Sequence, residues 1–430
     1  MRVCQVVTAA ALLPALTLTL TGCAADPPSW GALTPAASAP TREPAKGEPP
    51  SRAHDINGDG YQDLLVDAPD ENGTTLIILY GSRHGLSPDA RTVVTGKTLE
   101  LWSATPPATT ADLDGDGFAD VVARGGVPGS EAPYSLHVFW GGPSGVDGGR
   151  APTALRLPVK EERLRSGATA GDFDGDGAAD LAMSFDGANG MDGDLAVLYG
   201  PFTRAGAPAR HTLRPSPTGG DFWRMTADAI GAGRATGLLV NEADDGEQVP
   251  AWLVPAGPGG LAERGRKLNA GVASAWGDFD GDGTRDVVVA DDGSRNNEPG
   301  FETEPPGVAG VLTVYFGGRE AHVFRNLSGG RAVAGDFDGD GHDDLAYGGG
   351  AYQKTSRGPV RVFWGGRDGL RLGGAAAGGA NATPLAAGDY DRDGRDELVL
   401  GSGDGGELLR LRVTDGKRVS GEFDTADLLS

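Results

Sequence analysis

Cysteine is almost absent from this 430-residue chain, which contains only Cys4 and Cys23. Both lie near the N-terminus, so the body of the protein cannot build the disulfide framework that stabilises many exported proteins. Catalytic signatures are missing too: no Gly-x-Ser-x-Gly elbow, phosphate loop or His-Glu-x-x-His sequence occurs. The six histidines share no spacing with a candidate nucleophile. These absences disfavour the enzyme classes that such motifs mark.

An acidic loop, by contrast, recurs along the chain at intervals of 50 to 60 residues. The first copy reads Asp55-Ile56-Asn57-Gly58-Asp59-Gly60-Tyr61-Gln62-Asp63 and leads straight into the apolar run Leu64-Leu65-Val66. Five further intact copies begin at Asp112, Asp172, Asp278, Asp336 and Asp389. A seventh copy begins at Asp228, but Ile230 and Ala232 stand where carboxylates are expected. Repeats of this length predict a solenoid or a propeller.

The composition of the loops is typical of calcium binding. Oxygen atoms from the side chains at positions 1, 3, 5 and 9 and from the backbone carbonyl at position 7 suit a hard cation that takes six to eight oxygen ligands. Glycine at position 6 permits the sharp turn that brings these groups together. No cysteine or histidine side chain is among the predicted ligands, which argues against zinc and copper. Magnesium, which prefers a smaller and more hydrated site, ranks second.

Six calcium sites are therefore predicted, one in each intact loop. The predicted side-chain ligands are Asp55, Asn57, Asp59 and Asp63; Asp112, Asp114, Asp116 and Asp120; Asp172, Asp174, Asp176 and Asp180; Asp278, Asp280, Asp282 and Asp286; Asp336, Asp338, Asp340 and Asp344; and Asp389, Asp391, Asp393 and Glu397. The predicted carbonyl ligands are those of Tyr61, Phe118, Ala178, Thr284, His342 and Arg395. These loops are not EF-hands, because position 12 carries no glutamate and an apolar run begins at position 10.

The net charge of the chain is −23, from 37 basic and 60 acidic residues. Such a balance first suggests a basic partner. The intact loops, however, account for 23 of the carboxylates, and six calcium ions would halve the negative charge of the mature chain. No basic stripe that could neutralise phosphates is present, so nucleic-acid binding is disfavoured.

Five of the six intact repeats also contain a β-rich run that ends in an aromatic residue and glycine: Tyr80-Gly81, Trp140-Gly141, Tyr199-Gly200, Phe316-Gly317 and Trp364-Gly365. We expect these aromatic residues to pack between neighbouring sheets. Each repeat then reads as four strands: a short inner strand such as 168–171, a second such as 181–183, the aromatic strand, and an outer strand such as 92–94, 154–157 or 211–213. The predicted fold is an all-β, seven-bladed β-propeller over residues 51–430, with 418–428 as the outer strand of blade 7.

The motif Asp-x-Asn/Asp-Gly-Asp-Gly-x-x-Asp-Leu, followed by aromatic-Gly, resembles the FG-GAP (VCBS-like) repeat family, whose best-known members are integrin α-subunit propellers. The resemblance covers roughly residues 51–430. It implies that the acidic loops lie on the face opposite the ligand site. The loops between the second and third strands, 124–134, 185–194, 241–248, 291–310 and 348–358, would then line the ligand face. The copy at Asp228 departs from the family motif, so no metal is expected there.

The first 50 residues have a different character. Arg2 precedes an apolar stretch over residues 6–20, which predicts a signal peptide over residues 1–22. The sequence Leu20-Thr21-Gly22-Cys23 resembles a bacterial lipobox, which implies cleavage before Cys23 and a diacylglycerol anchor on it. Residues 24–50 contain seven prolines and predict an extended tether, residues 23–50, to the outer face of a bacterial membrane.

Three functions remain open at this point. The favoured one is a monomeric, membrane-anchored, calcium-dependent binding or adhesion module with a protein or glycan partner. A carbohydrate-processing enzyme on the same face is an alternative, but the calcium loops already account for many of the paired carboxylates that would suggest a glycosidase. The third is a scaffold for a membrane-protein partner.

Overall fold

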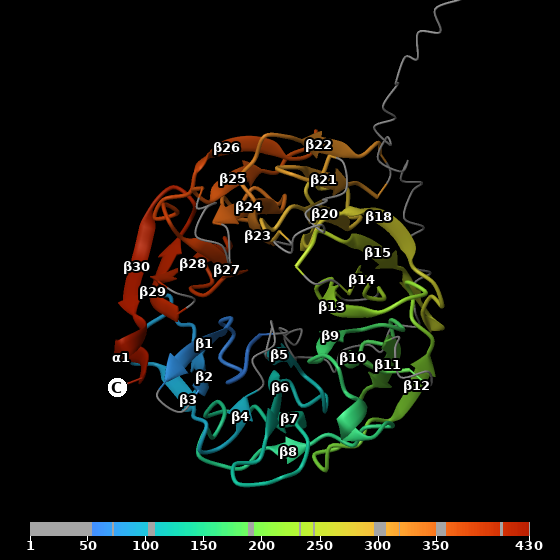
Figure 1. Ribbon diagram of the computed structural model, residues 1–430. Helices are drawn as coiled ribbons and strands as arrows, with labels where there is room; N and C mark the ends of the chain where they lie inside the picture. The colour runs from blue at the N-terminus through green and yellow to red at the C-terminus, as the bar shows by residue number, and fades with distance from the viewer. Residues whose placement is uncertain are drawn as a thin grey trace, which may run out of the picture.

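The computed structural model describes residues 54–429 except for 71–72, 102–107, 188–192, 232–233, 244–245, 296–306, 318, 350–357 and 405–406. The predicted signal peptide, Cys23 and the tether lie outside the described residues. Seven antiparallel sheets stand around a central opening like the blades of a propeller (Figure 1). The predicted all-β, seven-bladed fold is therefore confirmed.

The described strands fall into the blades as follows. Blade 1 contains β1 (Leu64–Asp70), β2 (Gly73–Leu79) and β3 (Arg91–Val94). Blade 2 contains β4 (Glu100–Leu101), β5 (Ala108–Ala111), β6 (Asp120–Gly126), β7 (Ser135–Phe139) and β8 (Thr153–Ala154). Blade 3 follows the short 3-10 helix η1 (Glu161–Arg163) and contains β9 (Thr169–Gly171), β10 (Asp180–Asp186), β11 (Gly193–Tyr199) and β12 (Arg210–Arg214).

Blade 4 contains β13 (Phe222–Ala227), β14 (Leu238–Glu242), β15 (Pro250–Val254) and β18 (Arg266–Ala270), with a small hairpin of β16 (Ala256–Gly257) and β17 (Gly260–Leu261). Blade 5 contains β19 (Ala273–Gly277), β20 (Asp286–Ala290), β21 (Leu312–Tyr315) and β22 (His322–Phe324). Blade 6 contains β23 (Gly330–Gly335), β24 (Asp344–Gly349), β25 (Arg361–Trp364) and β26 (Arg371–Ala375). Blade 7 contains β27 (Thr383–Gly388), β28 (Glu397–Asp404), β29 (Glu407–Thr414) and β30 (Val419–Asp424).

Two edges of the sheets differ from the prediction. The strand expected over residues 418–428 ends at Asp424, and Thr425–Leu429 form the helix α1, which buries Leu428 completely. The outer strand expected over 154–157 is reduced to the two residues of β8, and Leu155 is buried beyond its end. Blade 2 also gains the unpredicted β4, which pairs with the far end of β6.

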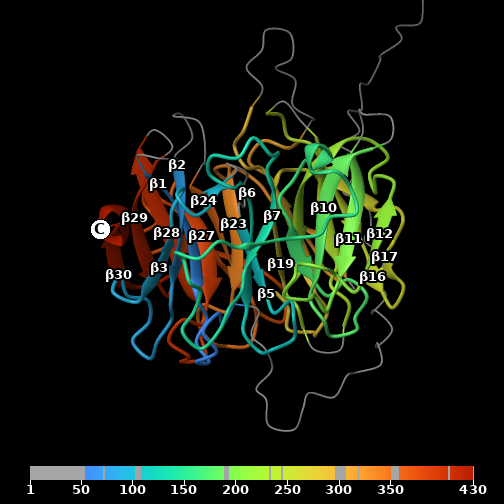
Figure 2. The ribbon, with the colours of Figure 1, turned by 90° about the horizontal axis from the view of Figure 1, so that it is seen from below.

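Antiparallel pairing decides which loops share a face. Because successive strands of each blade run in opposite directions, the loops between the first and second strands lie at the same end as the turns between the third and fourth strands. Loops between the second and third strands lie at the other end (Figure 2). We name these the acidic-loop face and the opposite face. The acidic loops and the 2–3 loops are on separate faces, as expected.

The hydrophobic core consists of seven layers, one between each pair of adjacent blades. Side chains alternate along the middle strands, so that on β6 Val121 packs toward blade 1 and Val122 toward blade 3. Aromatic residues from the third strands join these layers, as predicted: Tyr199 lies between blades 3 and 4, and Phe316 between blades 5 and 6.

The ring closes between blades 7 and 1. Tyr390, the second residue of the last acidic loop, packs against Leu64 and Leu79 of blade 1 and Val399 of blade 7. Its backbone carbonyl accepts a hydrogen bond of 3.0 Å from the amide of Ser82 in blade 1. The first and last blades are therefore joined by the same kind of loop contact that joins the others.

Candidate metal sites in the acidic loops

The first aspartate of each loop organises the turn. In blade 2, the Asp112 carboxylate accepts hydrogen bonds from the amides of Gly115 (2.8 Å), Asp116 (3.1 Å) and Gly117 (2.9 Å). Gly117 has a φ of +94°, as expected for position 6. The Asp55 and Asp336 carboxylates accept the same three bonds. This local bonding folds the alternate side chains toward one point.

The ninth residue connects the loop to the aromatic-Gly turn. One carboxylate oxygen of Asp120 accepts a bond from the amide of Leu113 (3.0 Å), and the other accepts one from Gly141 (2.8 Å). The same pair of bonds occurs in blades 1, 3, 5 and 6, where the second donors are Gly81, Gly200, Gly317 and Gly365. In blade 7, which lacks an aromatic-Gly, Glu397 accepts a bond from Tyr390.

The glycine of aromatic-Gly is thus part of the site, a role that the sequence did not reveal. A Cβ atom on Gly141 would overlap the carbonyl oxygen of Ala119, and Gly81, Gly200 and Gly365 meet the corresponding loop carbonyl. Only glycine lets the turn approach closely enough for its amide to reach the ninth carboxylate. The sequence feature that could have indicated this role is the glycine that follows each of these aromatic residues.

The second loop residue, also unassigned from sequence, fastens each intact loop to the next blade. These residues are almost completely buried, each in the layer between its own blade and the following one: Ile56, Leu113, Phe173, Phe279, Phe337 and Tyr390. Backbone bonds reinforce the contact, because the amide of Ala119 in blade 2 donates to the carbonyl of Asp55 in blade 1 at 2.8 Å. Equivalent bonds join Asp343 to Asp278 and Asp396 to Asp336.

Five loops bring three acidic ligand groups within 4.8 Å of one another. The groups are Asp112, Asp114 and Asp120; Asp172, Asp174 and Asp180; Asp278, Asp280 and Asp282; Asp336, Asp338 and Asp344; and Asp389, Asp391 and Glu397. The first loop, where Asn57 replaces one carboxylate, is not among these groups. Two buried oxygens, Oδ1 of Asp114 and Oδ1 of Asp172, have no hydrogen-bond partner. An oxygen-only donor set with buried acceptor atoms left over fits a hard cation.

Burial disfavours the ionised form of these carboxylates. It raises the pKa of Asp63, Asp120 and Asp344 to about 7, and that of Asp180, Asp286 and Glu397 to about 8. Neighbouring loop carboxylates raise these pKa values further, while the backbone hydrogen bonds partly offset the effect. A divalent cation among the carboxylates would offset both the burial and the smaller repulsion that raise these pKa values.

Basic side chains approach four of the loops, a feature that the sequence reading missed. Arg204 Nε lies 2.6 Å from Asp114 Oδ2, and its guanidinium also pairs with Asp116. Arg210 pairs with Asp174, Arg319 with Asp280, and Lys417 with Asp338. Each of these basic groups lies over the aromatic residue of an aromatic-Gly turn. Sequence separations of 36 to 90 residues hide these pairs from local pattern reading.

The incomplete loop of blade 4 holds arginine in place of a carboxylate cluster. Asp228, whose side chain is 2% exposed, pairs with Arg234 of the same loop and with Arg285 Nε of blade 5 at 2.8 Å. Arg285 also reaches Asp343 of blade 6 at 2.7 Å, so one guanidinium joins three blades. Burial lowers the pKa of Arg285 in itself, but the charges of Asp228 and Asp343 outweigh that effect and raise it.

Apolar packing is also rearranged at blade 4. Ile230, which stands where a loop carboxylate is expected, packs against the layer between blades 2 and 3. Thr236 makes the backbone contact to Asp172 that the eighth loop residue makes elsewhere, as its amide lies 2.6 Å from the Asp172 carbonyl. Trp276 fills the layer between blades 4 and 5 and donates its indole N–H to the Thr226 carbonyl at 3.1 Å.

Comparison with known proteins agrees with this geometry. A family model described as FG-GAP-like repeat matches residues 55–123, 112–183 and 336–400, and each match begins at the first aspartate of an acidic loop. The chain is a propeller that contains FG-GAP-like repeats. Integrin alpha-PS5 of Drosophila melanogaster is 36% identical over 100 residues, which are 21% of this FG-GAP chain and 9% of that protein. The chain therefore matches only a small part of its curated relative.

Similarity to solved structures is low. Rhamnogalacturonan lyase YesW is 13% identical, with 83% of this FG-GAP chain and 82% of that chain covered and a TM-score of 0.32. The Tc holotoxin pore of Photorhabdus luminescens is 16% identical, with 90% and 16% covered and a TM-score of 0.36. The biofilm matrix protein Bap1 of V. cholerae is 12% identical, with 92% and 82% covered and a TM-score of 0.26. Similarities of this size carry no functional argument.

The aromatic-Gly turn gives a sharp mutational test. Gly141→Ala should destabilise the protein by about 2 kcal/mol, because the new methyl group is forced against the Ala119 carbonyl. Gly142→Ala is a matched control, since nothing lies within 4 Å of a Cβ at that position. Urea denaturation of both variants makes the comparison. Equal midpoints would show that the close approach of the turn to the loop has no energetic importance.

The arginine pairing in blade 4 gives a second test. Asp228→Ala leaves two guanidinium groups without their buried partner, so we expect a loss of about 3 kcal/mol in unfolding free energy. Asp368→Ala, at an exposed position, should change stability by less than about 0.5 kcal/mol. The loss in Asp228→Ala should be the same with calcium and with EGTA. A loss seen in calcium alone would mean that Asp228 binds metal after all.

Proposed function

We propose that this FG-GAP propeller is a calcium-stabilised binding module that acts outside the cell and takes a protein or glycan ligand on its opposite face. The observation that carries the proposal is the structural difference between the two faces. On the acidic-loop face, the second residue and the backbone of each intact loop contact a neighbouring blade and hold the scaffold together. The opposite face, by contrast, presents exposed aromatic and basic side chains on rigid strand ends.

Calcium is the metal that the loops suit best. Each intact loop has predicted oxygen ligands at positions 1, 3, 5, 7 and 9, and five of these loops bring three acidic ligand groups within 4.8 Å of one another. A bound ion would supply two positive charges among three or four carboxylates and so stabilise the loop that contacts the next blade, in a protein body without cysteine. We propose six such ions, with none in blade 4, where arginine supplies the positive charge.

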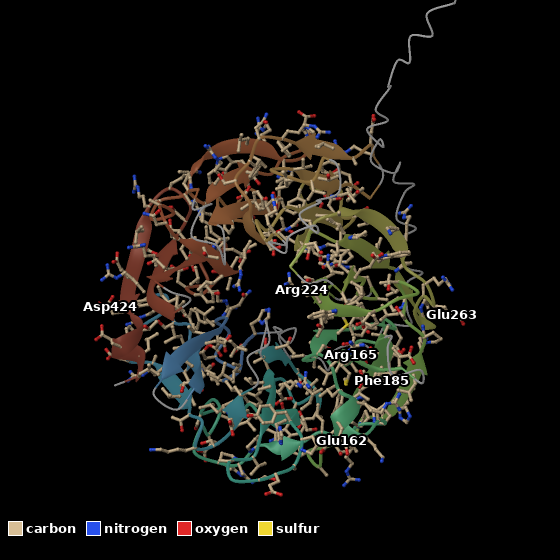
Figure 3. The ribbon with its side chains drawn as sticks, in the orientation of Figure 1. Glu162, Arg165, Phe185, Arg224, Glu263 and Asp424 are labelled. Carbon is tan, nitrogen blue, oxygen red and sulfur yellow. The ribbon has the colours of Figure 1, made fainter. Side chains whose placement is uncertain are left out.

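The opposite face is richest in candidate ligand-binding groups around blades 3 to 5. At the start of β13, a bulge leaves Trp223 48% exposed beside Arg224, whose side chain is 49% exposed. Arg165 lies nearby and pairs with Asp221 at 2.7 Å. Arg224 and Arg165 lie toward the central opening in Figure 3. Exposed tryptophan and arginine are the residue types that contribute most to binding interfaces. Residues 296–306 of the blade 5 loop, which was expected to line the ligand face, lie outside the described residues.

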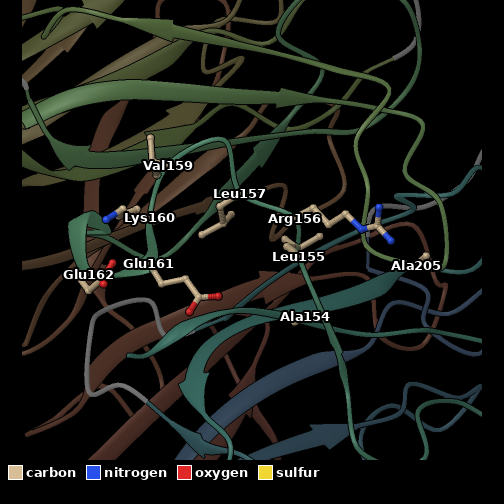
Figure 4. Close-up of a pocket in the computed structure, with 9 residues that line it drawn as sticks. All are labelled: Ala154, Leu155, Arg156, Leu157, Val159, Lys160, Glu161, Glu162 and Ala205. Carbon is tan, nitrogen blue, oxygen red and sulfur yellow. The ribbon is translucent and has the colours of Figure 1, made fainter. Parts of the chain in front are cut away.

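Carbohydrate processing has no comparable support. Among the residues that the structure describes, no group of three metal-ligating or acidic side chains gathers outside the acidic loops. A cavity of about 690 Å³ lies at the outer edge of blades 2 and 3 (Figure 4), where Glu161 and Glu162 extend in different directions from η1. Two carboxylates that do not converge on a common point cannot act as a glycosidase pair. The binding module is therefore the function that we propose.

The proposed location is the outer surface of a membrane. FG-GAP repeats are typical of extracellular proteins, and within the described part of the chain no helix is long and apolar enough to cross a bilayer. The lipobox-like sequence ending in Cys23 adds the proposal of a lipid anchor. The mature protein should partition into detergent, and Cys23→Ser should release it or block its processing. Mature protein that begins at another residue and lacks an acyl group would contradict the anchor.

Calcium should be bound at six sites and should stabilise the fold. Metal analysis should give six ions per chain, five in Asp114→Ala and six in Asp228→Ala. Chelation should lower the melting temperature by at least about 10 °C. When the free calcium concentration is 100 times the Kd of a site, the ion bound there adds about 2.7 kcal/mol to the free energy of unfolding. Calcium should restore the melting temperature, whereas magnesium should do so poorly.

The effect of chelation should depend on pH. Without metal, the ninth carboxyls have pKa values of about 7 to 8, above their unfolded value near 4, so the native state binds more protons between these limits. The stability of the metal-free protein therefore falls as pH rises from about 4 to about 8. EGTA should lower the melting temperature more at pH 8 than at pH 5.5. An unchanged melting curve after verified metal loss would reject the structural role of calcium.

Ligand binding can be tested with glycan arrays and with a screen of extracellular proteins. Wild-type protein should bind its ligand in calcium and lose binding in EDTA, because the scaffold loosens. Trp223→Ala and Arg224→Ala should weaken binding at least about tenfold without lowering the melting temperature. Leu213→Ala, an equally exposed apolar position on the outer strand β12, is the control. If the Trp223 and Arg224 variants bind as the wild type does, the proposed ligand face is wrong.

A further inference from the structure

A second candidate binding site lies on the acidic-loop face, between blades 6 and 7. A cavity of about 440 Å³ is lined by Asp338 and Asp340 from the blade 6 loop, Trp364, Arg371 and Leu372 from β25 and β26, and Lys417 from blade 7. Its volume falls in the range of small-molecule sites. It lies on the other face from Trp223 and Arg224, so it is separate from the proposed ligand face.

Trp364 forms one wall of this cavity. Glycine flanks it on two sides, since a Cβ on Gly373 would lie 2.6 Å from its Nε1 and a Cβ on Gly416 would lie 3.4 Å from its Cη2. No side chain from these two positions covers the indole. Lys417, whose side chain is 57% exposed, places its Nζ 4.4 Å from the ring centroid. The ring is therefore available to a ligand once the flexible lysine moves aside.

Lys417 is the loosest of the four basic groups that approach the acidic loops. Arg204 contacts two carboxylates and lies 2.6 Å from Asp114, whereas Lys417 Nζ is 3.4 Å from Asp338 Oδ2, at the limit of a hydrogen bond. Lysine is also a compact charge on a flexible stem, while arginine holds carboxylates with a planar fork. Lys417 can thus leave its partner at little cost.

We propose that this cavity binds an acidic pyranose, a sugar ring that carries a carboxylate, and that calcium in the blade 6 loop promotes this binding. The apolar face of the sugar ring packs on Trp364. Arg371 and Lys417 bind its carboxylate by charge-assisted hydrogen bonds. Asp340, half exposed at the rim, accepts hydrogen bonds from ring hydroxyls. The cavity thus offers a partner for each part of such a sugar.

The coupling follows from the position of Asp338. Its carboxylate is both a predicted metal ligand and the partner of Lys417. A cation held by Asp338 competes with the lysine for that carboxylate and repels its charge, which leaves Lys417 free for an anion. Coupling free energies are reciprocal, so the sugar must in turn raise calcium affinity at this loop.

Trigalacturonate is a suitable probe, and its methyl ester, which keeps the rings and removes the charge, is the matched neutral ligand. Isothermal titration and tryptophan fluorescence should show that trigalacturonate binds in calcium. Its affinity should be at least about tenfold weaker in EGTA, and the affinity of the ester in calcium should also be at least about tenfold weaker. Lys417→Ala and Trp364→Leu should each lose about tenfold in affinity. The melting temperature of each variant in calcium reports whether its fold is intact.

Lys267→Ala is the control variant. Lys267 lies 5.4 Å over the Trp252 ring and 3.2 Å from Glu242, a similar lysine, tryptophan and carboxylate group that is far from any intact loop. It should bind the probe as the wild type does, and so should Trp223→Ala, which tests the other face. Full affinity in folded Lys417→Ala, equal binding of the ester, or equal binding of triglutamate would overturn the site. Unchanged affinity in EGTA would overturn the coupling.

Discussion

The carboxylate at the ninth loop position is the group on which the acidic-loop face depends. It accepts one backbone bond from its own loop and, in five blades, a second from the glycine that ends the aromatic strand. It therefore joins the first, second and third strands of a blade through one buried anion. Burial raises its pKa, so it is a costly group unless positive charge is nearby. The other oxygen groups of the loop would hold the cation that supplies this charge, as proposed above.

The same loops also join each blade to the next. The second loop residue enters the layer between blades, and the amide of the eighth bonds to the loop of the preceding blade. A propeller without disulfides and with one layer per seam needs such contacts at every seam, because no single core spans the ring. The need for these contacts constrains the sequence of the acidic-loop face, whereas the sequence at the strand ends of the opposite face is free to vary. A ligand-binding site is therefore more compatible with the opposite face than with the acidic loops.

Sequence reasoning succeeded where a feature repeats and failed where it depends on distant residues. The period and the loop motif predicted seven blades and the order of strands, and the resemblance to integrin propellers implied the separation of the two faces. Position 2 was overlooked because a buried Ile56 or Phe173 reads like any apolar residue. Arg204 and Lys417 were missed because their partners lie 79 to 90 residues away. The bulge that exposes Trp223 has no local sequence signal either.

Blade 4 shows an alternative to a carboxylate-rich loop. There the carboxylate count is reduced, and Asp228 is balanced by Arg234 and Arg285, which are covalently part of the chain. An arginine occupies more space than an ion and can satisfy only one or two carboxylates, so it cannot serve a loop with four. The other loops keep three or four carboxylates, for which the proposed calcium ion would supply positive charge at higher density. Because Arg285 also joins Asp343 of blade 6, blade 4 gains a permanent link that no change in calcium can release. Calcium bound as proposed would make the other seams dependent on metal and leave this one independent of it.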